Sequence, residues 1–335
     1  MKQELLKYKE NFDYYYLVAP GSDYGKVMWQ DISLLNNGSV LQQPIKQCNK
    51  LIEVLHHLHF SFGINQYIHL PFQNIWKNQY SINEIDFDSN KKYCIIFTDV
   101  SAGRTDAIYL KSLSQHKNIT LILILVNRMS KRKKILKDRL QFFQQIYSFD
   151  YRDAIQNDFI FYPTNYSKVD LNVHSLKSDL FFVGMSKGRT DMLNDVYKLV
   201  ETNGGKADFY ISGAKKREKK YEGIHYNKWL DYSEVLQHIA SSNCILEIME
   251  KNQEGVTLRM MEAVCYNKRL LTNNQNIKES VFYKSGYIYV FENIEDIDIS
   301  FVMDKRPVDY HYNNEFSPIH FIDYINKITG ERKDL

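Results

Sequence analysis

The chain has 335 residues, of which 44% are hydrophobic and 25% are charged, and its formal net charge is +3. The length suggests two domains, and the composition is typical of a globular protein and excludes an intrinsically disordered one. The net charge is too small to indicate nucleic acid as the main partner.

Apolar runs alternate with segments of helical period along the first half of the chain. The runs predict strands at residues 14–19, 93–98, 119–126 and 145–149. The helical periods predict helices at residues 50–60, 105–114 and 130–143, and a turn at residues 101–104 precedes the second of them. In the first of these helices, one face carries Leu51, Val54, Leu55 and Leu58.

The alternation restarts after a polar stretch at residues 166–177. It predicts strands at residues 179–183, 207–212, 244–248, 269–272 and 287–291, and helices at residues 191–202, 232–240, 258–266 and 318–328. Such alternation is typical of parallel sheets covered on both faces. We therefore predict an α/β protein with two doubly wound domains, residues 1–168 and 169–310. Residues 311–335 form a C-terminal helix that can cross back to the first domain.

Two glycines and two cations follow the predicted strand at residues 179–183. Gly184 and Gly188 allow close backbone approach, and the helix that follows offers free N–H groups and the positive end of its dipole. Lys187 and Arg189 add full charges beside that helix end. The segment therefore predicts a phosphate site, with an ordinary turn that carries two solvated cations as the alternative.

A second strand–loop–helix segment spans residues 245–263. Thr257 suits the helix N-cap, and Arg259 and Glu262 share one helix face because they are three residues apart. Glu254 precedes Glu262 by eight positions, with seven residues between them. At a cleft, such a pair can accept hydrogen bonds from sugar and ribose hydroxyls. The alternative is a helix-surface ion pair between Arg259 and Glu262, worth about 0.2–0.5 kcal/mol.

This second segment resembles the donor-site motif of GT-B glycosyltransferases of bacterial capsule, exopolysaccharide and lipopolysaccharide biosynthesis. The residues that carry the resemblance are Gln253-x-Gly255-x-Thr257-x-Arg259-x-x-Glu262-Ala263, followed by residues 268–274. Glu254 and Glu262 are similar to the paired glutamates of that superfold, and residues 148–163 and 181–191 also fit its pattern. The sequence departs from the pattern at Glu247, where relatives often have Asp.

The resemblance implies a GT-B fold, in which two Rossmann-like domains face each other across a cleft. It implies an enzyme that moves a sugar from a nucleotide sugar to a growing, lipid-linked bacterial surface glycan. Glu262 would hold the ribose hydroxyls, while Lys187, Arg189 and Arg259 would face the diphosphate. The other implied donor-site residues are Gly184, Ser212, Gly213, Glu254, Gly255 and Thr257.

Two other functions fit the same fold. One is a catalytically inactive GT-B partner subunit of another glycosyltransferase, and the other is a nucleotide-sugar epimerase. Donor hydrolysis or binding of a nucleoside diphosphate would separate an enzyme from a scaffold. An epimerase would convert the donor without any acceptor.

Two aspartates at strand ends of the first domain, Asp23 and Asp99, are candidate bases for the acceptor hydroxyl. For each of them the alternative is a solvated loop aspartate. We expect neither a metal nor another cofactor, because fixed cations can neutralise the departing nucleoside diphosphate. The pairs Asp86/Asp88 and Asp296/Asp298 stand in acidic stretches, and His56, His57 and His59 lack ligand spacing with a carboxylate.

The predicted helix at residues 130–143 is basic. It begins with Lys131, Arg132, Lys133 and Lys134, and Phe142 and Phe143 end it. Each basic residue contributes about 1 kcal/mol at an anionic membrane surface, and the two phenylalanines would add apolar insertion; a solvated helix face is the alternative. The longest apolar run, residues 119–126, is much shorter than the roughly 20 residues of a membrane span. We therefore expect a cytoplasmic protein, at the inner face of the cell membrane if this helix binds lipid.

Overall fold

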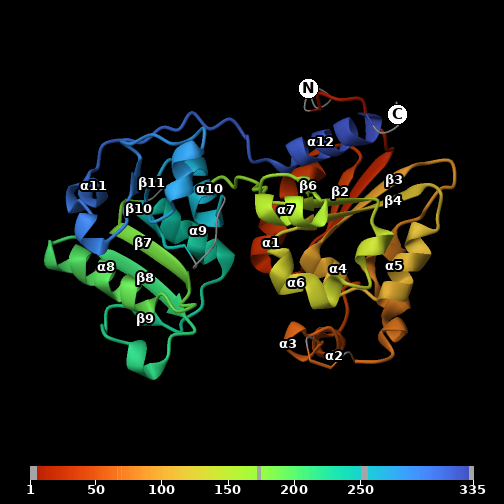
Figure 1. The fold of residues 1–335 in the computed structure, drawn as a ribbon, viewed down its shortest axis with the longest axis horizontal. Coiled ribbons are helices and arrows are strands. Elements are labelled where there is room, and N and C mark those ends of the chain that lie inside the picture. The colour runs from red at the N-terminus through yellow and green to blue at the C-terminus, as the bar shows by residue number, and fades with distance from the viewer. Residues whose placement is uncertain (1–5, 66, 69, 172–174, 250–255, 332–335) are drawn as a thin grey trace. The chain divides into compact units, whose positions relative to one another are not determined.

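The computed structural model describes residues 6–65, 67–68, 70–171, 175–249 and 256–331. The chain forms two compact units (Figure 1). The first contains Met1–Ser167 and Phe316–Leu335, and the second contains Lys168–Glu315. The chain therefore leaves the first unit once and returns to it with its last helix, α12 (Pro318–Glu331).

The first unit is built on a six-stranded parallel sheet in the order β2-β1-β3-β4-β5-β6. Its strands are β1 (Tyr14–Val18), β2 (Gly38–Leu41), β3 (Tyr93–Thr98), β4 (Ile119–Leu125), β5 (Gln145–Ser148) and β6 (Ile160–Phe161). From β1 the chain moves outward to β2 and then returns past β1 to β3. The reversal between β1 and β3 is the kind of point at which open α/β sheets bind ligands.

Helices connect these strands. They are α1 (Asp23–Met28), α2 (Lys50–His59), α3 (Phe62–Asn65), α4 (Asp99–Gly103), α5 (Ala107–Ser114), α6 (Met129–Leu136) and α7 (Tyr151–Asn157). Short 3-10 turns lie at η2 (Gln30–Leu34), η3 (Gln73–Gln79), η4 (Ser81–Glu84) and η5 (Leu140–Phe142).

The central strands β3 and β4 are buried on both faces. Alternate side chains point to opposite sides of a strand, so Ile95 and Leu121 join one apolar cluster while Ile96 and Ile122 join another. α12 covers the second cluster and adds Phe321, Ile322 and Ile325 to it. Burial on both faces explains why these two strands are continuous apolar runs in the sequence.

The second unit has its own six-stranded parallel sheet, in the order β12-β11-β10-β7-β8-β9. Its strands are β7 (Ser178–Met185), β8 (Ala207–Ser212), β9 (His225–Tyr226), β10 (Ser242–Glu247), β11 (Arg269–Thr272) and β12 (Ile288–Val290). Its helices are α8 (Thr190–Thr202), α9 (Tyr232–Ala240), α10 (Leu258–Cys265) and α11 (Ile299–Met303), with 3-10 turns η6 (Lys216–Glu218), η7 (Gln275–Glu279) and η8 (Ile294–Asp296). This order is the Rossmann order, and the chain reverses between β7 and β10.

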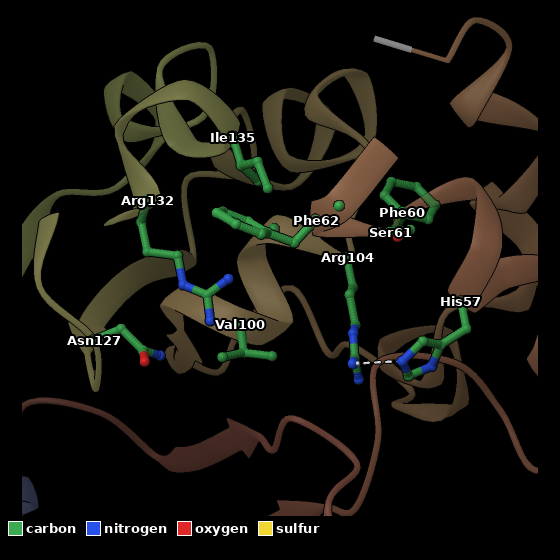
Figure 2. Close-up of a pocket in the computed structure, with 11 residues that line it drawn as sticks. His57, Phe60, Ser61, Phe62, Val100, Arg104, Asn127, Arg132 and Ile135 are labelled. Atoms are coloured by element: carbon green, nitrogen blue, oxygen red, sulfur yellow. Dashed lines mark hydrogen bonds between the residues drawn. The ribbon is translucent and has the colours of Figure 1, made fainter. Parts of the chain in front are cut away.

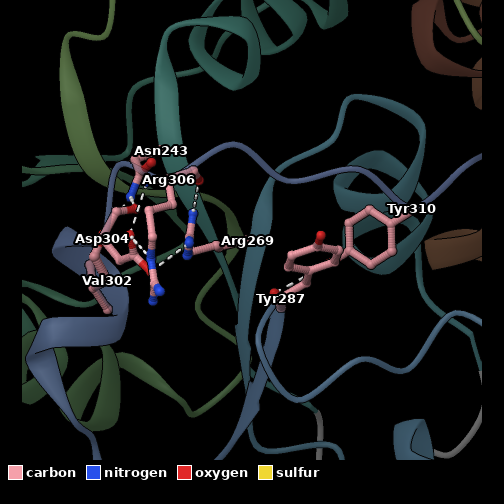
Figure 3. A network of polar contacts seen from close by, with 7 residues as sticks. All are labelled: Asn243, Arg269, Tyr287, Val302, Asp304, Arg306 and Tyr310. Carbon is pink, nitrogen blue, oxygen red and sulfur yellow. Dashed lines mark hydrogen bonds and ion pairs between the residues drawn. The ribbon is translucent and has the colours of Figure 1, made fainter.

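A polar network holds the segment that follows α11 against the sheet (Figure 3). The Arg269 guanidinium donates to the Arg306 carbonyl oxygen at 2.7 Å and pairs with the Asp304 carboxylate at 2.6 Å. The Asn243 side-chain amide donates to the carbonyl oxygens of Val302 and Asp304 at 2.7 and 2.9 Å. Bonds to charged groups are among the stronger ones, so the chain's exit from this unit is fixed at the start of β10 and β11.

The structure contains every strand that the sequence predicts and adds β2, β6 and β9. Two local predictions are wrong in detail. Residues 101–103 belong to a helix and not to a turn, because Thr98 and Ser101 form a capping box that starts α4 at Asp99. The basic helix does not reach residue 143, because α6 ends at Leu136 and a 3-10 turn follows.

Candidate active site

Two predicted donor segments meet at the carboxyl ends of β7 and β10, which are neighbours in the sheet. The loop after β7 carries Arg189, and the loop after β10 begins at Ile248. The Arg189 guanidinium donates to the carbonyl oxygens of Ile248, of Met185 at 2.6 Å and of Ser186 at 3.3 Å. One side chain therefore ties together two loops that lie about 60 residues apart in the sequence.

Arg189 is thus engaged with backbone carbonyls rather than directed only at solvent. Its role toward a diphosphate stays a prediction. As the residue before α8, it has no acceptor atom with which to cap that helix. The first N–H groups of α8 consequently keep the donor capacity by which helix ends bind phosphate.

The turn before α8 has the backbone conformation that its glycine permits. Gly188 has φ +78° and Lys187 has φ +41°, and a Cβ at Gly188 would meet no atom within 4 Å. A glycine therefore suits this position because of its positive φ, and not because a larger side chain would meet neighbouring atoms. The Lys187 side chain is exposed beside the start of α8.

Ser212 and Gly213, at the end of β8, reach the same loop. The Ser186 N–H donates to the Ser212 carbonyl oxygen at 2.7 Å, and the Ser186 hydroxyl donates to the Gly213 carbonyl oxygen at 2.9 Å. Gly213 has φ +72°. Gly184 lies within β7, where an added Cβ would approach the Phe182 ring to 3.2 Å. Of these three, the structure brings Ser212 and Gly213 into direct contact with the loop.

Thr257 caps α10, as predicted, by accepting a hydrogen bond from the Met260 N–H at 3.3 Å. Its hydroxyl also donates to the carboxylate of Glu247, the last residue of β10. Thr272, at the end of β11, donates to the other Glu247 oxygen at 2.5 Å. Burial raises the pKa of Glu247, while the two threonine hydroxyls act against that rise. Glu247 thus fixes the start of α10, a role that the sequence pattern alone did not reveal.

Glu262 is completely buried and forms an ion pair with Arg259, whose side chain is 17% exposed. Its second oxygen accepts a hydrogen bond from the Tyr232 hydroxyl of α9 at 2.9 Å. Burial raises the pKa of Glu262, and the Arg259 charge is the largest effect that opposes the rise. The ion pair is therefore buried and does not lie on the helix surface. The ribose-binding role of Glu262 stays a prediction. Glu254 and Gly255 lie outside the described residues.

The two candidate bases of the first unit lie in different surroundings. The Asp23 side chain is 63% exposed in the first turn of α1 and pairs with Lys26 at 3.2 Å. The Asp99 side chain has no exposed surface: it pairs with Arg132 at 2.8 Å and accepts from the Val126 N–H at 2.7 Å and the Asn127 amide at 3.0 Å. Asp99 anchors its surroundings, so of the two only Asp23 has access to solvent.

The side chains of the basic run on α6 differ in their exposure to solvent. Lys133 and Lys134 are exposed on α6, but Arg132 turns inward to Asp99. Phe142 and Phe143 pack into the first apolar cluster, and the prediction that they add a membrane-inserting surface is therefore wrong. Among the helices of the described ranges, none is long and apolar enough to cross a membrane.

The three neighbouring histidines bond to protein atoms. His56 Nε2 lies 3.0 Å from the Arg104 carbonyl oxygen, His57 Nε2 lies 2.9 Å from the Arg104 guanidinium, and His59 accepts from the Trp76 indole at 2.9 Å. Burial lowers the pKa of His56 to about 4. Within the part of the chain that the structure describes, no three His, Cys, Asp or Glu side chains form a group suited to a metal ion.

Sequence reasoning missed several residues of these sites. Tyr232 bonds to Glu262 from a helix 30 positions away, and Arg104 reaches both the loop after β1 and His57. No local pattern in the sequence could have paired these residues, since each contact depends on the sheet order.

The sequence matches no protein-family model, and no curated protein matches it. Solved structures share its architecture. One is an α-glucosyltransferase in complex with UDP and a 13-mer DNA that contains an HMU base, with a TM-score of 0.51, 12% identity and 95% coverage of both chains. Another is sucrose-phosphate synthase from Thermosynechococcus elongatus, with a TM-score of 0.50, 8% identity and coverage of 96% of this chain and 98% of that chain. With two Rossmann-like units, the protein has the GT-B fold of these glycosyltransferases, as predicted.

Proposed function

We propose that the protein is a glycosyltransferase that uses a nucleotide sugar as its donor. The observation that carries this proposal is the meeting of two donor-type segments at the point where the second sheet reverses, with Arg189 of one bonded to Ile248 of the other. Rossmann-order sheets bind nucleotides at this position. The solved α-glucosyltransferase of the same fold, which holds UDP, supports the proposal.

In the proposed reaction, the donor diphosphate lies at the N-terminus of α8 beside Lys187. The bond between the sugar's anomeric carbon and the diphosphate oxygen breaks, and a new bond forms from that carbon to the acceptor oxygen. The helix end and Lys187 stabilise the negative charge that develops on the leaving nucleoside diphosphate. The acceptor hydroxyl gives up its proton, for which the exposed Asp23 is the better candidate base.

Calorimetric titration with UDP, GDP, CDP and TDP tests the donor site. We expect wild-type protein to bind at least one of them, and Lys187→Gln to weaken that binding about tenfold, the equivalent of about 1.4 kcal/mol. Lys198→Gln removes the same charge from an exposed position near the other end of α8 and should leave the affinity unchanged. Absence of binding to all four nucleotides would contradict the proposal and favour an inactive partner subunit.

We also propose that the reaction needs no metal ion, because Lys187 and the start of α8 can neutralise the charge that develops on the leaving diphosphate. Transferase activity should then survive an excess of EDTA with less than a twofold loss. Activity that disappears with EDTA and returns with manganese would contradict this proposal.

The proposed acceptor is a lipid-linked glycan at the inner face of the cell membrane. The exposed lysines Lys133 and Lys134 support this, because each cation near an anionic surface contributes about 1 kcal/mol. Pelleting with anionic vesicles should fall at least fivefold in Lys133→Gln/Lys134→Gln and should weaken with salt. The control Lys111→Gln/Lys117→Gln makes the same change of charge at exposed positions of the same unit and should pellet like wild type. Equal pelleting of both double variants would contradict a role for α6.

A further inference from the structure

A pocket of about 430 Å³ opens in the first unit between α2, α3, α4 and α6 (Figure 2). Arg104 and Arg132 line it together with His57 and Phe62. In Figure 2 the side chains of Arg132 and Arg104 lie on either side of Val100, and the Arg104 guanidinium meets the His57 ring. None of the described residues that line the pocket is acidic.

The pocket lies at the ligand-binding edge of the first sheet. Val100 and Arg104 belong to the segment that follows β3, and Asn127 follows β4. The Arg104 guanidinium also donates to the Pro20 carbonyl oxygen at 2.6 Å, and Pro20 follows β1. Arg104 therefore bridges the ends of β1 and β3, between which the sheet order reverses.

The two arginines leave positive charge directed into this pocket. Arg104 uses one donor for Pro20 and another for His57, out of the five N–H donors of a guanidinium. Arg132 faces the buried Asp99 through Nε, and its guanidinium carbon lies 5.3 Å from the centre of the Phe62 ring. Burial and the nearby Arg132 charge lower the pKa of Arg104. An anion between the two side chains would relieve this repulsion.

The helix that forms one wall of the pocket, α2, also carries exposed apolar side chains. His57 and Phe60 line the pocket from the end of α2, while Leu51, Leu55 and Leu58 of that helix are 63%, 49% and 53% exposed. Phe62 of α3, which lines the pocket, is itself 40% exposed. Exposed apolar side chains that gather on one part of a protein mark interaction sites more often than ordinary surface does.

We propose that this pocket binds the phosphate or diphosphate group of a lipid-carried acceptor, with Arg104 and Arg132 as its ligands and the α2 face against the lipid chain. Guanidinium groups suit phosphate because they offer paired, charge-assisted N–H donors. This inference rests on the proposed function, because it assumes an acceptor and names the chemical group of that acceptor which the pocket binds. The donor site lies in the other unit and is assayed separately.

The first arm of the test is calorimetric titration with inorganic pyrophosphate while UDP, or whichever nucleotide binds, saturates the donor site. Arg104→Gln should weaken pyrophosphate binding at least tenfold. Arg132→Gln would leave Asp99 buried without its partner, so it is combined with Asp99→Asn, and this double variant should show a similar loss. Lys111→Gln, which removes a charge at an exposed position of the same unit, should bind like wild type. Unchanged binding in Arg104→Gln, or a loss in Lys187→Gln instead, overturns the inference.

The second arm identifies the apolar carrier. Farnesyl diphosphate below its micellar concentration should bind wild type at least tenfold more tightly than pyrophosphate does. Leu55→Ser/Leu58→Ser should remove this difference and leave pyrophosphate affinity unchanged, since neither leucine lines the pocket. Equal affinity for the two ligands in wild type overturns the lipid assignment. Normal nucleotide binding by the same samples shows that the proposed function stands even where this inference fails.

Discussion

Glu262→Ala is expected to lower the free energy of unfolding by about 3–5 kcal/mol, the usual effect of breaking a buried ion pair by removing one partner. In the wild-type structure the Arg259 side chain is only 17% exposed, and the variant would remove the carboxylate that pairs with it. It would also remove the acceptor of the Tyr232 hydroxyl. Chemical denaturation monitored by circular dichroism measures the loss.

The double variant Arg259→Met/Glu262→Met separates stability from binding. Replacing both charges with apolar side chains of similar volume is often neutral or stabilising, so this protein should regain most of the stability that Glu262→Ala loses. If the pair also serves the donor site, the folded double variant should still bind the nucleoside diphosphate at least tenfold more weakly than wild type. A Glu262→Ala variant as stable as wild type would show that the pair is not buried in solution. A double variant with normal nucleotide affinity would limit the pair to a structural role.

Acidification from pH 7 to pH 4 should lower the stability of the protein by about 3 kcal/mol through His56 alone, at about 1.4 kcal/mol for each pKa unit. Burial lowers the pKa of His56 from 6.5 in an exposed imidazole to about 4 in the folded protein. Between these values the unfolded state binds more protons than the folded state, so stability rises with pH. The contribution of His56 is complete above pH 6.5 and is lost as the pH falls toward 4.

His56→Gln provides the comparison, because a glutamine amide can still donate to the Arg104 carbonyl oxygen but does not titrate over this range. On acidification from pH 7 to pH 4, the unfolding free energy of this variant should fall by less than that of wild type. The difference between the two falls should be about 3 kcal/mol, the contribution of His56. The control His116→Gln replaces an exposed histidine and should lose as much stability on acidification as wild type does. The same acid sensitivity in His56→Gln would mean that other groups cause it.

The sequence predicted the central strands well because their burial on both faces requires continuous apolar runs. β3 and β4 are such runs. The strands that were missed, β2, β6 and β9, stand at or next to sheet edges and have only two to four residues. Short edge strands with half-exposed side chains leave little periodic signal.

The donor segments were predictable for a different reason, since their glycines and cap residue act locally. Thr257 and Gly188 could be assigned from their neighbours in the sequence. The engagement of Arg189 with Ile248 depends on two strands being adjacent, as does the contact of Arg104 with Pro20. Such contacts are set by topology, and a single sequence does not specify topology. The same limit explains why Arg132 was expected to face solvent.

The return of α12 to the first unit affects the order in which the protein folds as it leaves the ribosome. Phe321, Ile322 and Ile325 complete an apolar cluster with β1, β3 and β4, and Asn326 accepts a hydrogen bond from the Tyr15 hydroxyl at 2.7 Å. The first unit therefore waits until the residues of α12 have been translated, whereas all of Lys168–Glu315 is available earlier. Although domains generally fold from the N-terminal end during synthesis, here the unit that contains β1 is completed after the unit that follows it in the sequence. A nascent chain stalled before residue 318 would expose the apolar face that α12 covers, which makes it a substrate for chaperones.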